Sequence, residues 1–363
     1  MLPINPPRLQ ASLEQLVTFH EPGTLYTRRS FTDVYRQARE WLKEEMQASG
    51  LSVTTDSAGN ISGRRAGQKA SLPALATGSH IDTVANGGRF DGAIGVLCAL
   101  EIVRALNDAA IELDHPLEII DFLAEEPSAF GISTIGSRGM GGGLSDSMLA
   151  LQDDAGRHLN DCIRALGGDP AGLHKPLRTA GAIKAFLELH IEQGPVLEEN
   201  GLEIGVVTGI AGIQRYRVRI VGEQGHAGTV PMDRRQDALV AAAKVILEIQ
   251  QTALRQNQED SQCVATTGTL QVFPNHPNVI PGQVSLNFEL RSIDKTLLRN
   301  LGTQLERQIQ HIVEQEGCTI DVELLSSSTP VLSDEGIVEL VERSAHTLGL
   351  TTRRLPSGAG HDT

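Results

Sequence analysis

The chain has 363 residues, of which 40% are hydrophobic and 21% charged, a composition typical of a folded protein with more than one domain. Its formal net charge of −14 argues against nucleic-acid binding, which needs a basic surface, and means that an anionic substrate would need a local cation. No apolar run approaches the roughly 20 residues of a membrane span, and the first residues, "MLPINPPRLQ", lack a signal-peptide pattern. The few, widely spaced cysteines indicate a reducing compartment, so we expect a cytoplasmic protein without disulfides or a thiolate zinc site.

Up to about residue 209, helix patterns alternate with short buried strands. A helix is predicted over 31–50 and a hairpin over 51–65. The buried segments that follow are "LPALATGSH" (72–80), the apolar helix "GAIGVLCALEIVRAL" (92–106), "LEIIDFLAEE" (117–126) and "AIKAFLELH" (182–190). Strands that alternate with helices predict an α/β domain with a mostly parallel sheet that is covered on both faces.

From about residue 210 the pattern changes to strands with strict alternation. "QRYRVRIV" places Tyr216, Val218 and Ile220 on one face. Two helices and three further strands follow, in the order β-α-β-β-α-β of a ferredoxin-like α+β domain. After Ser326 the alternation of helices and strands seen before residue 209 returns. We therefore expect a catalytic domain of residues 1–209 and 327–363 with an inserted domain of residues 210–326.

Histidines and carboxylates fall at the ends of the predicted strands. His80, Glu125–Glu126 and His190 each end one strand, and Asp91 begins the buried helix. Ligands of open α/β sheets bind outside the carboxyl ends of the strands, so these side chains should converge on one edge. Imidazole with carboxylate suits zinc, manganese or cobalt. The sequence therefore predicts a metal site there.

Each of these residues also has an ordinary structural explanation. His80 alone would more often be a hydrogen-bonded loop histidine, and Asp91 alone is a simple helix N-cap. Glu125–Glu126 alone would be a solvated strand end, and His190 a buried structural residue. Asp82, two residues after His80, fits a carboxylate that orients a ligand imidazole. The joint placement favours the metal site.

Several motifs, in this order, resemble those of the M20 metallopeptidase-like amidohydrolases. They are "GSHIDTVANGGRFDG", "AEEPSAFG", "LELHIEQGPVLE", "GHAGTVPMDRRQDAL", "PNHPNVIPG", "FELRSID" and "SGAGHDT". The most similar branch contains N-carbamoyl-L-amino-acid hydrolases, allantoate amidohydrolases and β-ureidopropionases. The resemblance implies a hydrolase with two divalent metal ions (Zn, or Mn or Co) and an inserted lid domain that also forms the homodimer.

The resemblance also implies roles for the residues at the strand ends. His80 and His190 would be terminal metal ligands, Asp91 the bridging carboxylate and Glu126 the ligand of the second metal. Glu125 would be the general base, which takes a proton from water and returns it to the leaving nitrogen.

Further residues are implied in the lid domain and at the end of the chain. His226 would reach the substrate carbonyl oxygen from the neighbouring subunit, although a histidine in a glycine-rich turn needs no such role. Arg291, on the polar face of its strand, would bind the substrate carboxylate with its planar fork, although exposed strand arginines are common. Four others, Gln193, Asn275, Asn278 and Gly360, would contact the carboxylate or the ureido group, although turn chemistry beside Pro274, Pro277 and Pro281 would also explain the amide side chains.

Two features depart from the family pattern. "AEEPSAFG" has proline and alanine where relatives more often carry Gly-Ser-Arg. Family members also continue past "GHD" to a last histidine ligand, whereas this chain ends at Thr363. We therefore expect a truncated form with an incomplete second site, which binds at most one metal tightly, through His80, Asp91 and His190, and hydrolyses little.

The function predicted from the sequence is metal-dependent cleavage of the linear C–N amide of an N-carbamoyl-L-amino acid to the amino acid, ammonia and carbon dioxide. Allantoate amidohydrolase and β-ureidopropionase are the nearest alternatives, followed by an M20 dipeptidase or aminopeptidase. An alternative of another class is a metal-poor, non-catalytic dimeric scaffold. Bound metal per chain would separate the scaffold from the enzymes.

Overall fold

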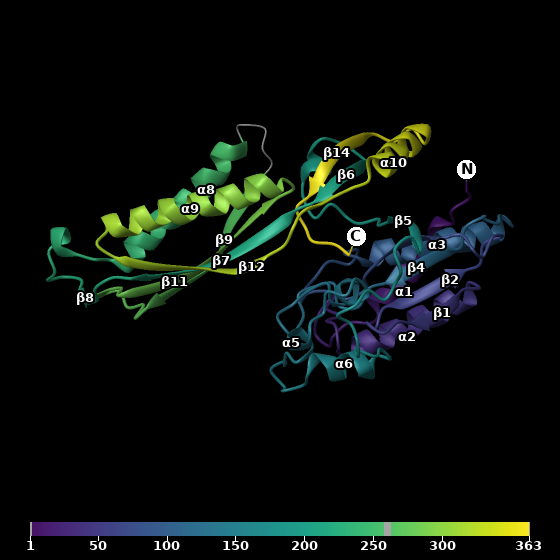
Figure 1. Ribbon diagram of the computed structural model, residues 1–363, viewed down its shortest axis with the longest axis horizontal. Coiled ribbons are helices and arrows are strands. Elements are labelled where there is room, and N and C mark those ends of the chain that lie inside the picture. The colour runs from purple at the N-terminus through teal and green to yellow at the C-terminus, as the bar shows by residue number, and fades with distance from the viewer. Residues whose placement is uncertain (1, 258–262, 363) are drawn as a thin grey trace. The chain divides into compact units, whose positions relative to one another are not determined.

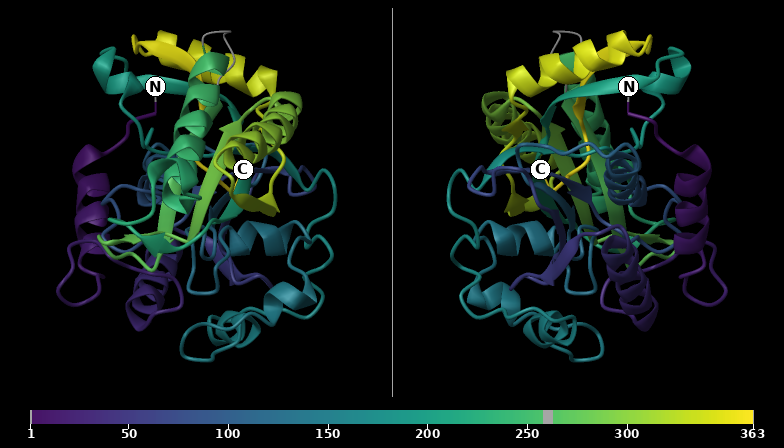
Figure 2. Two further views of the ribbon diagram at one scale, coloured as in Figure 1. Left: turned by 90° about the vertical axis from the view of Figure 1, so that its left-hand side faces the viewer. Right: turned by 90° about the vertical axis from the view of Figure 1, so that its right-hand side faces the viewer.

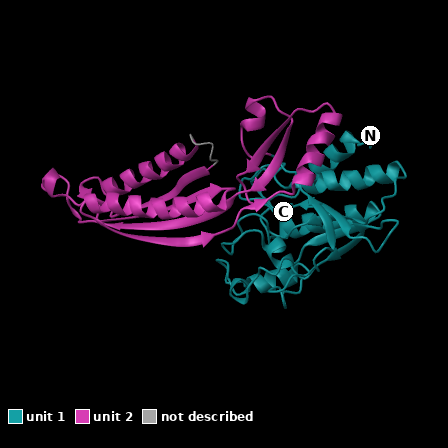
Figure 3. Ribbon diagram, turned by 45° about the horizontal axis from the view of Figure 1, so that its top comes forward, with its two compact units in different colours: residues 1–191, 361–363 teal, residues 192–360 magenta. Residues whose placement is uncertain are grey.

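The computed structural model describes residues 2–257 and 263–362, which form two compact units. Unit 1 contains residues 1–191 and 361–363, and unit 2 contains residues 192–360 (Figure 3). The domain boundaries predicted at residues 209 and 326 lie close to the two ends of one sheet within unit 2. The division of the chain into a catalytic domain and an inserted domain stays a prediction. In the described part of the chain, no helix is long and apolar enough to cross a membrane.

Unit 1 is built on a five-stranded sheet with the order β1-β2-β4-β3-β5 (Figure 1). Its strands are β1 (Ser52–Thr55), β2 (Ile61–Arg65), β3 (Ala74–Ser79), β4 (Leu117–Asp121) and β5 (Ile183–Leu187). β3 pairs in parallel with β4 and β5, whereas β2 pairs antiparallel with both β1 and β4. The sheet is thus mixed rather than mostly parallel, because the predicted hairpin joins it along β4.

Helices pack on this sheet through strongly apolar faces. α2 (Asp33–Ala48) contacts the β1–β2 hairpin, and α3 (Ala93–Asp108) contacts β3 and β4. α3 is buried on most of its surface, as the nearly uniform apolar sequence predicts, and α1 (Pro6–Val17) packs against it. Three short helices complete the unit: α4 (Ile135–Met140), α5 (Asp146–Leu149) and α6 (Leu159–Ala165).

Unit 2 contains an antiparallel four-stranded sheet with the order β12-β7-β11-β9. Its elements are β7 (Gly212–Val221), α8 (Ala238–Asn257), β9 (Cys263–Phe273), β11 (Gln283–Ser292), α9 (Lys295–Gln315) and β12 (Thr319–Ser327). α8 and α9 lie side by side on the sheet (Figures 1 and 2) and share one apolar core with its buried face. The structure confirms the predicted β-α-β-β-α-β order.

The rest of unit 2 forms two smaller groups of elements. A three-stranded sheet has the order β13-β6-β14, and α10 (Glu335–Thr347) packs on it. Its strands are β6 (Ile204–Ile210), β13 (Val331–Leu332) and β14 (Thr352–Ser357). β8 (Gly225–His226) pairs with β10 (Val279–Ile280), and the short helices are α7 (Val196–Glu199) and η1 (Met232–Arg234).

Candidate metal centre

Three side chains from separate segments of unit 1 lie together beyond the ends of the sheet strands. His80 follows β3 directly, Asp91 precedes α3, and His190 lies three residues after β5. Their possible ligand atoms all lie within 4.8 Å of one another. His190 Nε2 is 3.3 Å from an Asp91 carboxylate oxygen, and the two imidazole rings are stacked with centroids 5.8 Å apart. The structure thus brings these residues together at the sheet edge that the sequence predicts.

The backbone determines which nitrogen each histidine can offer to a metal. His80 Nδ1 lies 3.0 Å from the carbonyl oxygen of Asp82, and His190 Nδ1 lies 2.9 Å from that of Ile191. Because a carbonyl only accepts hydrogen bonds, Nδ1 carries the proton in both neutral rings. Nε2 of each ring is then left with its lone pair, as a metal ligand requires. Two imidazoles and a carboxylate fit a zinc, manganese or cobalt ion.

Gly92 allows Asp91 to approach His80. It has a positive φ of 63°, which other residues rarely adopt, and an added Cβ would lie 2.4 Å from atoms of the His80 ring. A larger residue here would displace either the imidazole or the start of α3. The glycine after Asp91 is therefore part of what places carboxylate and histidine together.

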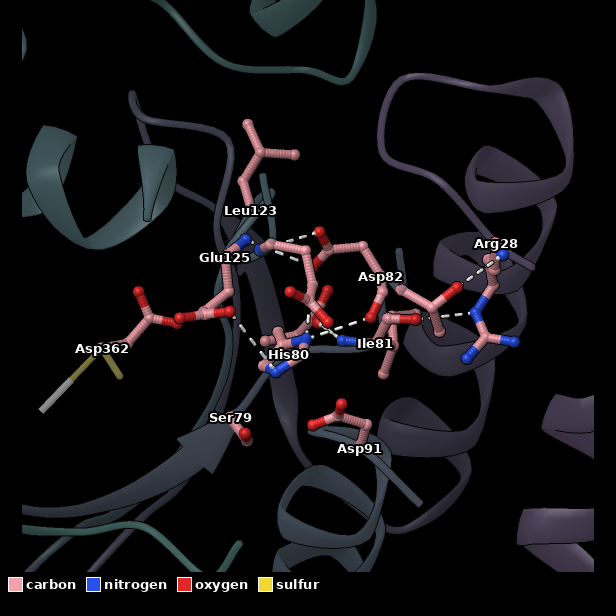
Figure 4. Close-up of polar contacts among 12 residues, drawn as sticks. Arg28, Ser79, His80, Ile81, Asp82, Asp91, Leu123, Glu125 and Asp362 are labelled. Carbon is pink, nitrogen blue, oxygen red and sulfur yellow. Dashed lines mark hydrogen bonds and ion pairs between the residues drawn. The ribbon is translucent and has the colours of Figure 1, made fainter. Parts of the chain in front are cut away.

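Asp82 links His80 to Glu125 (Figure 4) and also bonds to Glu126. Its two carboxylate oxygens accept the backbone N–H groups of Glu125 and Glu126, each at 3.2 Å, and one of these oxygens lies 3.5 Å from His80 Nδ1. The prediction that Glu125 and Glu126 end the strand is wrong, because β4 ends at Asp121 and the glutamates lie in the following loop. Their positions are set by Asp82 rather than by the sheet.

Burial controls the protonation of these glutamates. It raises the pKa of Glu125 to about 9, and the nearby carboxylates of Asp362 and Asp82 act in the same direction. Burial also raises the pKa of Glu126 to about 7, with contributions from Asp82 and Asp91. A bound divalent cation would favour the ionised forms, so this carboxyl-rich environment fits a cation.

A second group of possible ligands consists of Glu188, His190 and His361, which also lie within 4.8 Å of one another. The rings of His190 and His361 are 4.6 Å apart. Since Nδ1 of His190 bonds to its neighbouring carbonyl, only Nε2 remains for a metal. Both groups would need that nitrogen, so His190 cannot serve an ion in each group at once.

Two carboxylates at this centre escaped prediction from the sequence. Glu188 accepts a hydrogen bond from Ser79 Oγ at 2.6 Å, and Asp362 accepts one from Ser137 Oγ. The other oxygen of each carboxylate is buried without a hydrogen-bond partner among the described residues. Burial raises the pKa of Glu188 and raises that of Asp362 to about 8. The spacing of Glu188 and His190 by two residues, which is the repeat of one strand face, was an available signal.

Glu126, implied as the ligand of a second metal, belongs to neither three-residue group among the described residues. Its carboxylate interacts electrostatically with Asp91. His361 lies next to His190 and was assigned no metal-binding role from the sequence.

The residues expected to bind substrate lie in unit 2. His226 on β8 is exposed and accepts the Gly228 N–H through Nδ1 at 3.0 Å. The backbone carbonyl of Asn278 accepts the N–H of Ala227, so Asn278 lies beside His226. Asn275 and Gln193 both adopt positive φ, of 59° and 56°.

Arg291 lies on the polar face of β11, as predicted. The alternate residues Val284, Leu286, Phe288 and Leu290 are buried. The guanidinium donates from Nε and Nη2 to one oxygen of Glu289, at 2.8 and 2.6 Å, and from Nη1 to the carbonyl of Gly358 at 2.7 Å. This last bond holds Arg291 against the segment that leads to Gly360, two residues further along the chain.

A family model described as peptidase family M20/M25/M40 matches residues 76–363. The chain belongs to this family. It is 40% identical over 356 residues to an N-carbamoyl-L-amino-acid amidohydrolase of Paenarthrobacter aurescens, covering 98% of this chain and 86% of the relative. A ureidoglycolate hydrolase of Oryza sativa is 36% identical, and the match covers 98% of this chain and 74% of the relative. An allantoate amidohydrolase of Bacillus subtilis is 34% identical, and the match covers 93% of this chain and 81% of the relative.

Solved structures agree with this family assignment. The crystal structure of a hydantoinase/carbamoylase family amidase from Burkholderia ambifaria matches with a TM-score of 0.87 and 36% identity, and 99% of this chain and 87% of that chain are covered. The M20 chain is accordingly a hydrolase of the amidohydrolase type with a mixed α/β fold. Divalent metal dependence is general in this family, and the chain carries candidate ligand groups.

Proposed function

We propose that this M20 enzyme hydrolyses the linear C–N amide bond of an N-carbamoyl-L-amino acid. One water converts the ureido group into the free amino group, ammonia and carbon dioxide. The observation that carries the proposal is the cluster of His80, Asp91 and His190 with the buried Glu125 beside it. The relative of Paenarthrobacter aurescens, an N-carbamoyl-L-amino-acid amidohydrolase, supports the choice of substrate class.

In this proposal His80, Asp91 and His190 hold one divalent ion tightly, and Asp91 and Glu126 offer an incomplete set of ligands to a second one. When bound, such ions polarise a carbonyl and lower the pKa of water. Glu125 is the general base: a carboxylate oxygen takes the proton of the attacking water and then delivers it to the leaving nitrogen. Its Oε2 lies 3.7 Å from His80 Nε2, and thus beside the metal-facing nitrogen.

We further propose that residues from Gln193 onward recognise the substrate. Arg291 binds the substrate carboxylate, for which that carboxylate must replace Glu289 on the guanidinium fork. His226 donates a hydrogen bond to the carbonyl oxygen as negative charge develops on it. Gln193, Asn275, Asn278 and Gly360 offer amide and backbone groups to the rest of a small polar acid.

The proposal includes a homodimer that forms through the inserted domain of residues 210–326, which acts as the lid. β9 is an edge strand of its sheet, and such edges can pair with another chain. On α8, Val240, Leu247 and Leu254 recur at intervals of seven residues and are 44, 59 and 49% exposed. An exposed apolar strip on a helix, in a domain with a strand edge of this kind, favours an isologous interface.

A hydrolysis screen tests the function. The purified chain is incubated with N-carbamoyl-L-amino acids, N-carbamoyl-β-alanine, allantoate, ureidoglycolate and dipeptides, each with added Mn²⁺, Co²⁺ or Zn²⁺. Fastest release of ammonia from N-carbamoyl-L-amino acids is the expected result. Cleavage of dipeptides alone would contradict the ureido assignment, and absence of both metal and hydrolysis would favour the scaffold.

Allantoate and ureidoglycolate remain the second candidate substrates. The 36 and 34% identical relatives named for these substrates support them, and both compounds present a ureido group and a carboxylate to the same residues. The relative kcat/KM values in the screen decide between them.

A further inference from the structure

The peptide unit of Ile81 is held at both ends by charged side chains. Ile81 lies between His80 and Asp82, where the chain has left β3 and its polar groups need partners outside the sheet. Its N–H donates to Asp121 Oδ1 at 3.1 Å. Its carbonyl accepts from Arg28 Nε at 2.7 Å (Figure 4). Both polar groups of the residue between histidine and aspartate are therefore fixed by side chains.

The two partners are themselves anchored in the core of unit 1. Asp121, the last residue of β4, is fully buried, and its Oδ2 lies 3.1 Å from Nη1 of Arg39 on α2, which is 1% exposed. Arg39 also donates to the Tyr35 hydroxyl at 3.1 Å and to the carbonyl of Gly59. The Ile81 N–H is thus connected through one carboxylate to α2.

Arg28 is anchored in a similar way. It is 3% exposed, and its Nη1 donates to the carbonyls of Leu16 and Phe19 at 3.2 and 3.0 Å. Its own backbone N–H donates to Thr83 Oγ1 at 2.8 Å, just beyond Asp82. The segment from Ile81 to Thr83 is consequently fixed from this side as well.

Stability alone does not account for charged groups in these places. Burying an ion is energetically costly, and replacing a buried ion pair with apolar residues often leaves stability unchanged or improved. A neutral hydroxyl or amide could satisfy a peptide group at lower cost. Hydrogen bonds to charged groups are roughly twice as strong as neutral ones, which suits a segment that must be held in one position.

We propose that Arg28, Asp121 and Arg39, which we call the Ile81 clamp, are positioning residues for the metal centre. The clamp fixes the Ile81 peptide and thereby the direction of the His80 imidazole on one side. On the other side it fixes the Asp82 carboxylate, which holds the backbone of Glu125 and Glu126. This inference rests on the proposed metal centre. It assigns to that centre three charged side chains that would not bind the metal but would position its ligands.

The variant Asp121→Asn tests the clamp. Asp121 accepts from the Ile81 N–H with one oxygen and from the Arg39 guanidinium with the other. An amide has only one oxygen, so its NH₂ group must face either the Arg39 guanidinium or the Ile81 N–H, which are both donors. Glu118→Gln is the matched control. Glu118 is a buried carboxylate on the same strand and bonds to Arg178 and Ser62 rather than to residues 80–82.

The measurements are the dissociation constant for Mn²⁺ or Co²⁺, by competition with a chromophoric chelator, and the visible absorption of bound Co²⁺. Both variants should lose thermal stability. Asp121→Asn should also raise the metal dissociation constant about 10- to 100-fold, the usual effect of losing such an outer partner, and alter the Co²⁺ spectrum. Glu118→Gln should change the constant by less than about threefold and keep the spectrum, because Glu118 bonds to none of residues 80–82.

Arg28→Lys tests the other end if Asp121→Asn does not fold. Lysine keeps the charge but cannot reach the Ile81 carbonyl and the Leu16 and Phe19 carbonyls together. It should weaken metal binding about tenfold, whereas Arg178→Lys, its control, should not.

The possible outcomes separate the clamp from the metal centre. Native metal affinity in Asp121→Asn or Arg28→Lys, or equal weakening in the controls, overturns the clamp and leaves the centre intact. If the unmodified chain binds no divalent metal, or His190→Ala binds it as well as the unmodified chain, the proposed centre fails and the clamp fails with it.

Discussion

Replacing Glu125 with glutamine should abolish turnover and leave metal binding intact. Glu125 belongs to neither ligand group among the described residues, and its position depends on the backbone N–H bond to Asp82. Glutamine has the same shape and keeps that bond, so the fold and the histidine ligands should be undisturbed. What is lost is a carboxylate that can accept the proton of water.

The expected loss follows from the role of a positioned base. Such a base contributes about 10²–10⁴-fold to the rate, which corresponds to about 3–5 kcal/mol in the activation barrier. We expect kcat to fall by this factor and KM to change by less than about threefold, because Glu125 is assigned no part in substrate binding. The assay measures ammonia released from the best substrate of the screen, together with metal content per chain by elemental analysis.

Glu126→Gln is the matched control for this prediction. Glu126 is the next residue, and its backbone N–H bonds to the same Asp82. As the proposed ligand of a second metal, it should lose bound metal as well as turnover. A Glu125→Gln enzyme with kcat within about tenfold of the unmodified chain would falsify the base assignment, and so would loss of metal equal to that in Glu126→Gln.

Three further predictions concern other parts of the molecule. Arg291→Lys should raise KM about 10- to 100-fold, the range for a lost charged hydrogen bond, with little change in melting temperature; an unchanged KM with lower stability would make Arg291 structural. Leu247→Glu should convert the homodimer to a monomer in light scattering without unfolding it, and a monomeric unmodified chain at micromolar concentration would contradict the interface. In the metal-free protein, the pKa of Glu125 is raised to about 9 and that of Asp362 to about 8. Since these carboxyls retain protons in the folded state that the unfolded chain has lost, the free energy of unfolding should decrease from about pH 7 to about pH 8. Added Mn²⁺ should reduce this decrease, and a free energy that rises over the same interval would refute the reasoning.

The candidate ligands could be predicted because the topology of the sheet determines where they lie. His80 and His190 follow the parallel strands β3 and β5, whose carboxyl ends meet at one edge. Asp91 was predictable from the strong apolar pattern of the helix that follows it. Local pattern and one general rule of α/β sheets were sufficient for these three residues.

Other features depend on contacts that no local pattern reports. The hairpin is predictable, but its antiparallel pairing along β4 is a tertiary choice. Apolar residues continue past Asp121 to Ala124, so the sequence does not show that β4 ends at Asp121. Arg28 lies in a segment without periodicity, and its contact with Ile81 spans 53 residues, so sequence reasoning missed it.

The carboxylates of β4 and of the loop that follows it differ in the groups that neutralise them. Those within the strand have structural partners, whereas those in the loop belong to the proposed metal centre. At Glu118, burial acts to raise the pKa, but the hydrogen bonds from Arg178 and Ser62, together with the charges of Arg178 and Arg64, lower it overall. At Asp121, burial raises the pKa to about 6, although Arg39 opposes it. At Glu126 and Glu125 burial raises the pKa to about 7 and about 9, and neither has an ion pair to Lys or Arg among the described residues. Guanidinium groups thus neutralise Glu118 and Asp121 within the strand. A divalent cation is the group that would neutralise Glu125 and Glu126 in the loop that follows.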